Sequence, residues 1–153
     1  MSLNPRHRWS KLQTALYRIT DPGIRFQIHC VAYRMNWNQW GRNHVPRSWI
    51  TVGKEIIWDY PKDFTTMQLD DDNYPYGDSI SIMSWLIREY VDCPPSDIFM
   101  EFPADRWNLI PVLRVCDRRV GKRRLSSMLT APEYERLRPI ISKRLHEKIY
   151  DRT

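Results

Sequence analysis

The chain has 153 residues, 42% of them hydrophobic and 27% charged, a composition that excludes a disordered chain and suits one globular domain. No stretch approaches the roughly 18 consecutive apolar residues of a membrane span, and no apolar segment follows the charged start as in a secretion signal. The net charge is +6, and the three cysteines, odd in number and far apart, are typical of a reducing compartment. We expect a cytoplasmic protein with a single domain over 1–153, ordered from about 8 to 150.

A helix is predicted near the start of the chain, from about Trp9 to Ile19. One face of this segment collects apolar residues at three- and four-residue steps, namely Trp9, Leu12, Leu16 and Ile19. Ser10 and Gln13 have the spacing of a capping box. The helix is expected to end at the Asp21-Pro22-Gly23 turn, since Pro22 lacks the amide donor that a continuing helix needs.

Three strands are predicted next. Residues 25–35 alternate between two faces, one of them largely apolar, which is typical of a half-buried strand. Two β-rich runs, 49–52 and 55–58, are separated only by Gly53 and Lys54, and a glycine at this place favours a type II′ hairpin turn. The three strands should therefore form an antiparallel meander.

The remainder of the chain is predicted to be helical. Ser79 opens a helix that ends before Cys93-Pro94-Pro95, and a short helical turn is expected over 96–102. A helix over about 107–120 should end at Gly121, because glycine readily takes the left-handed conformation that follows many helices.

The last helix is expected to begin at Thr130-Ala131-Pro132-Glu133, which has capping-box spacing, and to be kinked or split at Pro139. These elements predict an α+β fold. It would consist of an N-terminal helix, the three-stranded antiparallel meander and a C-terminal helical set packed on one face of the sheet.

The densest group of charges is a basic cluster of Arg118, Arg119, Lys122, Arg123 and Arg124. If helical geometry continues past Gly121, the first four share an exposed face that suits phosphate or nucleic-acid binding. The alternative is structural. The net charge is +7 over 1–53, −9 over 54–105 and +8 over 106–153, so the cluster can instead pair with the acidic middle of the chain or complement a helix dipole.

A loop between the first two strands carries Trp37, Trp40, Arg42 and His44. Trp and Arg are the residues that most often anchor interfaces, and they also stack on bases. The loop is therefore the candidate site for a protein partner. The alternative is that its indoles fold back over the open face of the sheet.

No residue pattern predicts catalysis or metal binding. Asp70-Asp71-Asp72 lacks the alternating acids and the sixth-position glycine of a calcium loop, and the His and Cys residues are too scattered for zinc. Adjacent His29 and Cys30 point to opposite faces of a strand, whereas Cys93 paired with His44 or His146 stays open. We expect no catalytic residue, no metal and no cofactor.

Four patches of the sequence resemble a family of short uncharacterised bacterial proteins. They are Trp9-Ser10-Lys11-Leu12, Tyr33-Arg34, Trp49-Ile50-Thr51-Val52 with Lys54-Glu55-Ile56, and Asp117 to Leu125. The resemblance implies a bacterial protein and brings no established activity, cofactor or catalytic residue. The loop from Trp37 to His44 is longer and richer in Trp than that pattern.

The sequence thus predicts a non-catalytic interaction or accessory module. It would bind a protein partner, or a second copy of itself, through the Trp37 to His44 loop and the exposed face of the sheet. The alternative prediction is nucleic-acid or phosphate binding through the basic cluster, and no membrane partner is expected.

Overall fold

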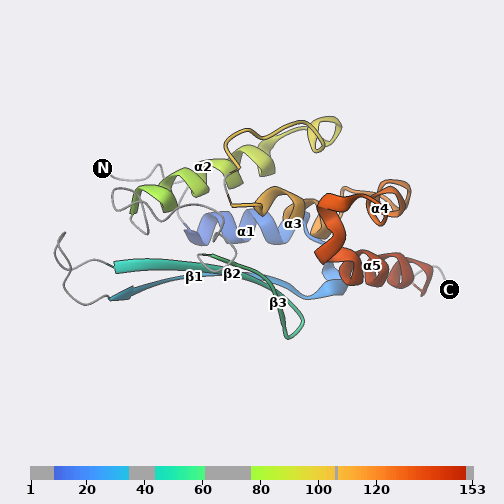
Figure 1. Ribbon diagram of the computed structural model, residues 1–153, viewed down its shortest axis with the longest axis horizontal. Helices are drawn as coiled ribbons and strands as arrows, with labels where there is room; N and C mark the ends of the chain where they lie inside the picture. The colour runs from blue at the N-terminus through green and yellow to red at the C-terminus, as the bar shows by residue number, and fades with distance from the viewer. Residues whose placement is uncertain (1–8, 35–43, 61–76, 106, 151–153) are drawn as a thin grey trace.

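The computed structural model describes residues 9–34, 44–60, 77–105 and 107–150. In chain order the elements are α1 (Trp9–Ile19), the 3₁₀ helix η2 (Pro22–Ile24), β1 (Phe26–Arg34), β2 (His44–Val52), β3 (Glu55–Tyr60), α2 (Gly77–Asp92), the 3₁₀ helix η4 (Pro95–Asp97), α3 (Leu109–Cys116), α4 (Lys122–Met128), the 3₁₀ helix η5 (Pro132–Leu137) and α5 (Arg138–Tyr150). The strands form an antiparallel sheet in the order β1-β2-β3, and the helices lie on one side of it or beyond its end (Figure 1). The predicted α+β fold is confirmed.

The sheet contains one irregularity, which lies in β3. β1 pairs with β2 over its full length, from Phe26 opposite Val52 to Arg34 opposite His44. Between β2 and β3 the register shifts, since Ile50 faces Trp58 while Thr51 faces Ile56, so that Ile57 is the extra residue of a β-bulge. A bulge changes the direction in which the neighbouring side chains point.

The β2–β3 turn follows the prediction from its glycine. Gly53 has a φ of +61°, in the left-handed region that a side chain disfavours, and nothing lies within 4 Å of a Cβ built on it. Backbone conformation rather than crowding therefore requires the glycine.

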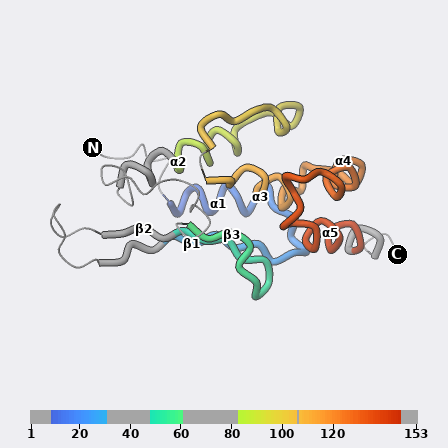
Figure 2. The backbone as a smooth tube through the Cα atoms, in the orientation of Figure 1, coloured from blue at the N-terminus to red at the C-terminus, as the bar shows by residue number. Residues whose placement is uncertain are grey.

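The hydrophobic core lies between the sheet and the helices. Each layer contributes a fully buried residue, such as Ile28 from β1, Leu16 from α1, Ile87 from α2 and Leu113 from α3. α1 contacts both β1 and α2 and runs between them (Figure 2). None of the described helices is both long and apolar enough to cross a bilayer.

The helix expected over 107–120 is shorter than predicted, and Gly121 does not end it. α3 stops at Cys116 because the next residues pair with the α1–β1 connection: the amide of Asp21 donates to the carbonyl of Cys116 (2.8 Å), and the amide of Arg118 donates to the carbonyl of Ile19 (2.7 Å). Gly121, with φ −82°, instead precedes α4, a helix that the sequence analysis missed. A long-range backbone pairing has overridden the local helical pattern.

Neither predicted capping box forms. The Gln13 amide donates to the carbonyl of Ile28 rather than turning back to Ser10. The Thr130 hydroxyl donates to the carbonyl of Ser127, and the residue that caps η5 is Ala131, through its backbone alone. The predicted split near Pro139 is confirmed, since η5 ends directly before α5 begins at Arg138.

Side chains of α1 close the free edge of β1 at Ile28. The Tyr17 hydroxyl accepts a hydrogen bond from the amide of Ile28 (3.2 Å) and lies within donating distance of its carbonyl (3.3 Å). Gln13 Nε2 donates to the same carbonyl over 2.7 Å. The outward-facing backbone groups of this residue are thus satisfied within the chain.

Replacing Tyr17 with Phe should lower the free energy of unfolding by about 1 kcal/mol, because it removes these hydroxyl contacts and keeps the ring. The ring contact with Phe26, at 6.1 Å between centroids, is retained in this variant. Hydrogen exchange of the Ile28 amide should accelerate, whereas Thr14→Ala on the same helix should leave it unchanged. An unaltered Ile28 exchange rate in Tyr17→Phe would show that the edge is not closed by this hydroxyl.

Candidate functional site

Three adjoining hollows lie where η5 passes α3 and the segment 99–105. Their volumes are 290, 530 and 300 Å³. Glu133 lines all three, Pro111 joins the first to the second, and Phe99 joins the second to the third. We call this row of hollows the η5 groove, with an Arg136 end, a middle and an Arg124 end.

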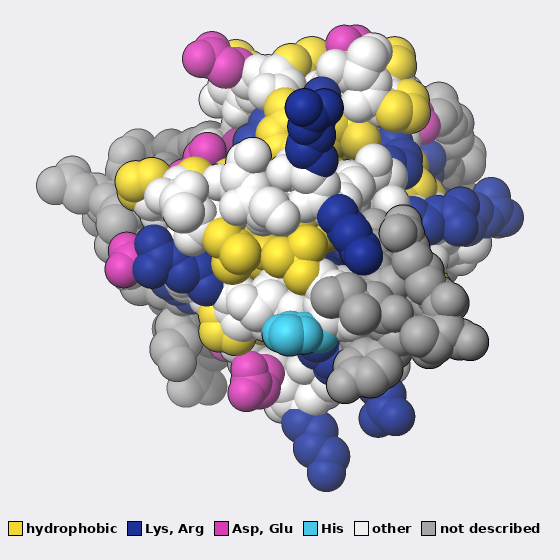
Figure 3. Space-filling view, turned by 90° about the vertical axis from the view of Figure 1, so that its right-hand side faces the viewer, with side chains coloured by type: hydrophobic (Ala, Val, Ile, Leu, Met, Phe, Trp, Pro, Cys, Tyr) yellow, Lys and Arg dark blue, Asp and Glu magenta, His cyan; other side chains and the backbone are white. Residues whose placement is uncertain are grey.

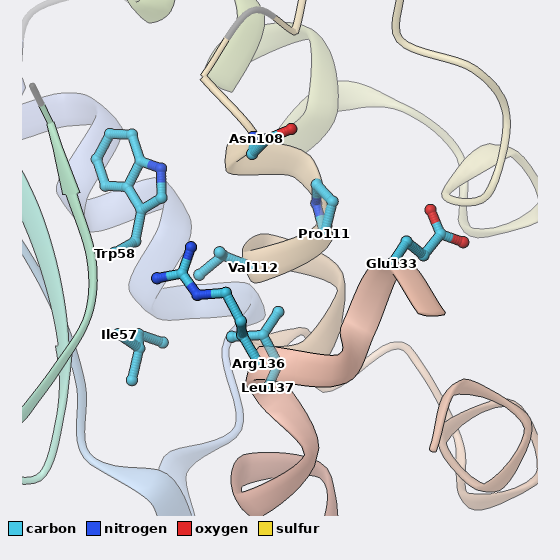
Figure 4. A pocket seen from close by; sticks show the side chains of 8 residues that line it. All are labelled: Ile57, Trp58, Asn108, Pro111, Val112, Glu133, Arg136 and Leu137. Carbon is cyan, nitrogen blue, oxygen red and sulfur yellow. The ribbon is translucent and has the colours of Figure 1, made fainter. Parts of the chain in front are cut away.

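The Arg136 end lies between the sheet and the helices (Figure 4). Its walls are apolar side chains of β3 and α3, including Ile57, Trp58 and Val112. The Arg136 guanidinium extends across the hollow toward the strand, while Glu133 points the other way. Trp58 is held in place because its indole N–H donates to the carbonyl of Trp107 over 2.8 Å.

The middle of the groove is organised by Arg114, a buried side chain of α3. Its guanidinium donates to the carbonyls of Ile98 (2.9 Å) and Met100 (2.7 Å) and to the Tyr134 hydroxyl (3.3 Å). Its Cζ also lies 5.3 Å from the ring centroid of Phe99. These contacts fix the 98–100 segment against α3 and leave Met100 40% exposed in the groove.

Asp105 determines how the chain enters α3 beside the middle hollow. Its carboxylate accepts hydrogen bonds from the amides of Trp107 (3.2 Å), Leu109 (3.1 Å) and Ile110 (2.9 Å). These amides lie at the N-terminal end of α3, where no backbone acceptor is available to them. Asp105 is thus engaged in holding the groove wall.

The Arg124 end combines an aromatic ring, a cation and an apolar hollow. Arg124 Cζ lies 4.5 Å from the Phe99 ring centroid, so this ring contacts two guanidinium groups. Met128, Ala131 and Tyr134 supply the apolar lining. Burial raises the pKa of the Tyr134 hydroxyl, although its hydrogen bond with Arg114 opposes the shift.

The basic cluster does not form one exposed face. α3 ends at Cys116, Arg119 turns inward to form an ion pair with Asp117 (2.8 Å), and Arg124 lies on Phe99. Arg118 and Arg123 are exposed and Lys122 is half-buried. Seen from the α4–α5 end, dark blue side chains are spread over the surface with other side chains between them (Figure 3). The common face was predicted on the condition that one helix continues past Gly121, and this condition is not met.

A buried polar cluster surrounds Asp117. Its carboxylate, which is fully buried, accepts hydrogen bonds from the Tyr90 hydroxyl (2.5 Å) and from Arg119 Nη2 (2.8 Å). Burial and the nearby carboxylate raise the pKa of Tyr90. Arg119 also donates to the carbonyl of Cys93 over 3.3 Å. The cluster joins the end of α2 to the turn that follows α3.

The cysteine thiols are in environments that disfavour the reactive thiolate. Burial raises the pKa of Cys93, even though Arg119 acts in the opposite direction, and it raises the pKa of Cys116 to about 12. Cys30, half-buried in β1, also has a pKa raised by burial. All three are free thiols.

The aromatic loop falls largely outside the described residues. This applies to Trp37, Trp40 and Arg42, and also to the acidic run 70–72. His44 is the first residue of β2, and its backbone pairs with Arg34. Among the described residues, no group of three His, Cys, Asp or Glu side chains is placed to hold a metal ion.

Comparison with known proteins places the chain in a family. A family model matches residues 8–85, half of the chain, and its description is the SF0329 protein family. The chain belongs to the SF0329 protein family. No match was found among curated proteins or among solved structures.

The SF0329 match covers α1, the sheet and the first half of α2. It includes three of the four sequence patches that carried the resemblance, and Asp117 to Leu125 lies beyond it. The η5 groove takes only its β3 wall, Ile57 and Trp58, from the matched region. The segment 99–105, α3, α4 and η5, with residues beside these helices, supply the rest.

Sequence reasoning missed the groove because its residues come from four separate helices and strands and from the segment 99–105. The bulge at Ile57 has no signal in the alternation of β3, and the place of Arg124 depends on where the chain turns before α4. The only available sign was indirect, in that Phe99, Met100 and Phe102 follow two prolines outside any regular apolar repeat.

Proposed function

We propose that this SF0329 family member is a non-catalytic interaction module that binds a segment of a partner protein in the η5 groove. The observation that carries the proposal is that three adjoining hollows share lining residues, Glu133 among them, and have volumes of 290, 530 and 300 Å³. A row of open hollows suits several side chains of one extended segment, whereas a small ligand is usually enclosed in one pocket.

The chemistry of the lining supports a protein partner. Phe99 and Met100 lie in the groove with arginines at both ends, and aromatic residues, Met and Arg are enriched in protein interfaces. The polar groups Asp105 and Arg114 hydrogen-bond to the backbone and hold the walls in place. A preformed groove lowers the ordering cost of binding.

Nucleic-acid binding through the basic cluster has less support. Arg119 is engaged with Asp117, and Arg124 covers a face of Phe99 on which a base would otherwise stack. Arg118, Lys122, Arg123 and the N–H groups of Arg124 remain for phosphate contacts. Binding through them would weaken steeply with added salt, and this dependence separates the two functions.

We propose further that the protein is bacterial and works in the cytoplasm. Three free thiols, at Cys30, Cys93 and Cys116, suit a reducing compartment. The resemblance to short bacterial proteins supports the origin.

The test is selection of peptides from a phage-displayed random library on the whole protein, followed by affinity measurements with labelled synthetic peptides. Met100→Asp should weaken binding roughly tenfold or more, because it introduces a charge into an apolar contact. Ile56→Asp is the matched control, since Ile56 is 53% exposed on β3 and pairs with Thr51, on the sheet face that carries no helices.

Equal binding by wild type and Ile56→Asp, with loss in Met100→Asp, supports the groove. The reverse pattern would move the site to the open sheet face. Nucleic-acid binding would replace the proposal if it weakens with salt, survives in Met100→Asp and is lost when Arg118 and Arg123 are both changed to Ala. Sedimentation velocity would show whether the protein binds a second copy of itself instead.

A further inference from the structure

Arg124 is a positioned guanidinium whose hydrogen-bond donors are not used by the described residues. It is exposed, and its contact is with the face of Phe99, 4.5 Å from Cζ to the ring centroid. A ring face attracts the guanidinium without using its N–H groups, so all of the donors remain available to a partner.

The ring that holds Arg124 is itself fixed. Phe99 lies between Ile98 and Met100, and the carbonyls of both neighbours accept hydrogen bonds from Arg114, at 2.9 and 2.7 Å. Arg114 also contacts the Phe99 ring. A guanidinium that rests on an anchored ring loses less side-chain entropy when it binds an anion.

The hollow beside Arg124 is apolar and has little other hydrogen-bonding capacity. Met128, Ala131 and Tyr134 line it, the Tyr134 hydroxyl accepts from Arg114, and the Ser127 hydroxyl donates to the carbonyl of Arg123 (3.3 Å). A large apolar side chain of a partner would fill this volume of 300 Å³ without leaving a buried polar group unpaired.

The charges around the hollow define the anion. Arg124 is the only Lys or Arg among the described residues that line it, and Glu133 supplies a negative charge at the side that joins the middle of the groove. One cation facing one carboxylate suits a singly charged anion placed on Arg124, away from Glu133, better than a dianionic phosphate.

We infer that the Arg124 end of the η5 groove recognises a partner segment in which an aspartate or glutamate side chain lies beside a large apolar one. This inference rests on the proposed function. The carboxylate would accept paired hydrogen bonds from the guanidinium while the apolar side chain enters the hollow between Met128 and Tyr134.

A charge exchange tests the inference with peptides selected from the random library on the wild-type protein. They should carry Asp or Glu next to Leu, Phe or a similar residue. Arg124→Glu should weaken binding of these peptides roughly tenfold or more, equivalent to about 1.4 kcal/mol, and a peptide with Lys in place of the acid should recover affinity for this variant. Arg136→Glu, at the other end of the groove, is the matched control. This variant should still prefer the acidic peptide over the peptide with Lys.

Two other results overturn the inference in different ways. In the first, the selected peptides lack an acidic residue, bind the Met100→Asp variant less tightly, and bind the Arg124→Glu variant as tightly as the wild-type protein. This result would refute recognition of an acid but would still support peptide binding in the groove. Failure to select any peptide whose binding depends on Met100 would refute both.

Discussion

Replacing Arg144 with Ala is expected to lower the free energy of unfolding by about 3 to 5 kcal/mol. The side chain is fully buried, and its guanidinium donates to the carboxylate of Asp21 (2.9 Å) and to the carbonyls of Val115 (2.8 Å) and Val120 (3.2 Å). Removal leaves one carboxylate without its counter-charge and two carbonyls without donors. Urea unfolding at neutral pH measures the loss.

Two variants make this test specific to the hydrogen bonds of Arg144. Arg123→Ala removes an exposed arginine and should change the stability by no more than about 0.5 kcal/mol. Arg144→Lys keeps the charge, but a single ammonium cannot reach three acceptors arranged around a guanidinium, so its loss should be intermediate. Equal stability of Arg144→Ala and Arg123→Ala would disprove this role.

Asp117→Asn should lower the free energy of unfolding by about 3 kcal/mol, because it removes the counter-charge of Arg119 inside the protein. The carboxylate has no exposed surface and also accepts a hydrogen bond from Tyr90. Asn retains the size of the side chain, but its amide nitrogen replaces one carboxylate oxygen. That nitrogen would face other donors, either the Tyr90 hydroxyl and Arg119 Nη2 or the backbone amide and Nε of Arg119. Chemical denaturation followed by Trp fluorescence measures the change.

A double-mutant cycle with Tyr90→Phe distinguishes the loss of this hydrogen-bonded cluster from a general loss of stability. Tyr90→Phe alone should destabilise the protein by about 1 to 2 kcal/mol, and by less when Asp117 is already Asn. Asp92→Asn is the surface control: its ion pair with Arg88 spans 3.5 Å, Asp92 is 43% exposed, and we expect a loss of about 0.5 kcal/mol or less. Strictly additive effects of the two buried changes would contradict the coupling.

The fold was predictable where local pattern and turn chemistry determine it. The spacing of Leu12 and Leu16 defines α1, the alternation around Ile28 defines β1, and Gly53 defines the hairpin turn. In each case the residues that decide the structure are near neighbours in the chain.

The prediction was wrong where distant segments meet. Val120 continues the apolar stripe of α3 and is buried, but it reaches the core through a turn, because residues 116–118 pair with residues 19–21. No pattern in the local sequence predicts that pairing. The same event rotates Arg119 inward toward Asp117 and separates the basic cluster that the sequence presents as continuous.

The candidate site was beyond sequence reasoning for a related reason. A dense group of cations shows where charge is concentrated along the chain, but not which guanidinium rests on a ring and which forms an ion pair. The position of Arg124 on Phe99 depends on Arg114 holding residues 98–100, and this requires the complete packing of α3 against that segment.

The closed edge at Ile28 also limits how this protein can assemble. An added strand, from a partner or from a second copy, needs free outward-facing backbone groups, and those of Ile28 already bond to Tyr17 and Gln13. A strand could join the middle of β1 only by pulling these α1 side chains away. The sheet is thus protected from edge-to-edge pairing at this point. Removal of the Tyr17 and Gln13 side chains should expose a strand edge that is prone to aggregation.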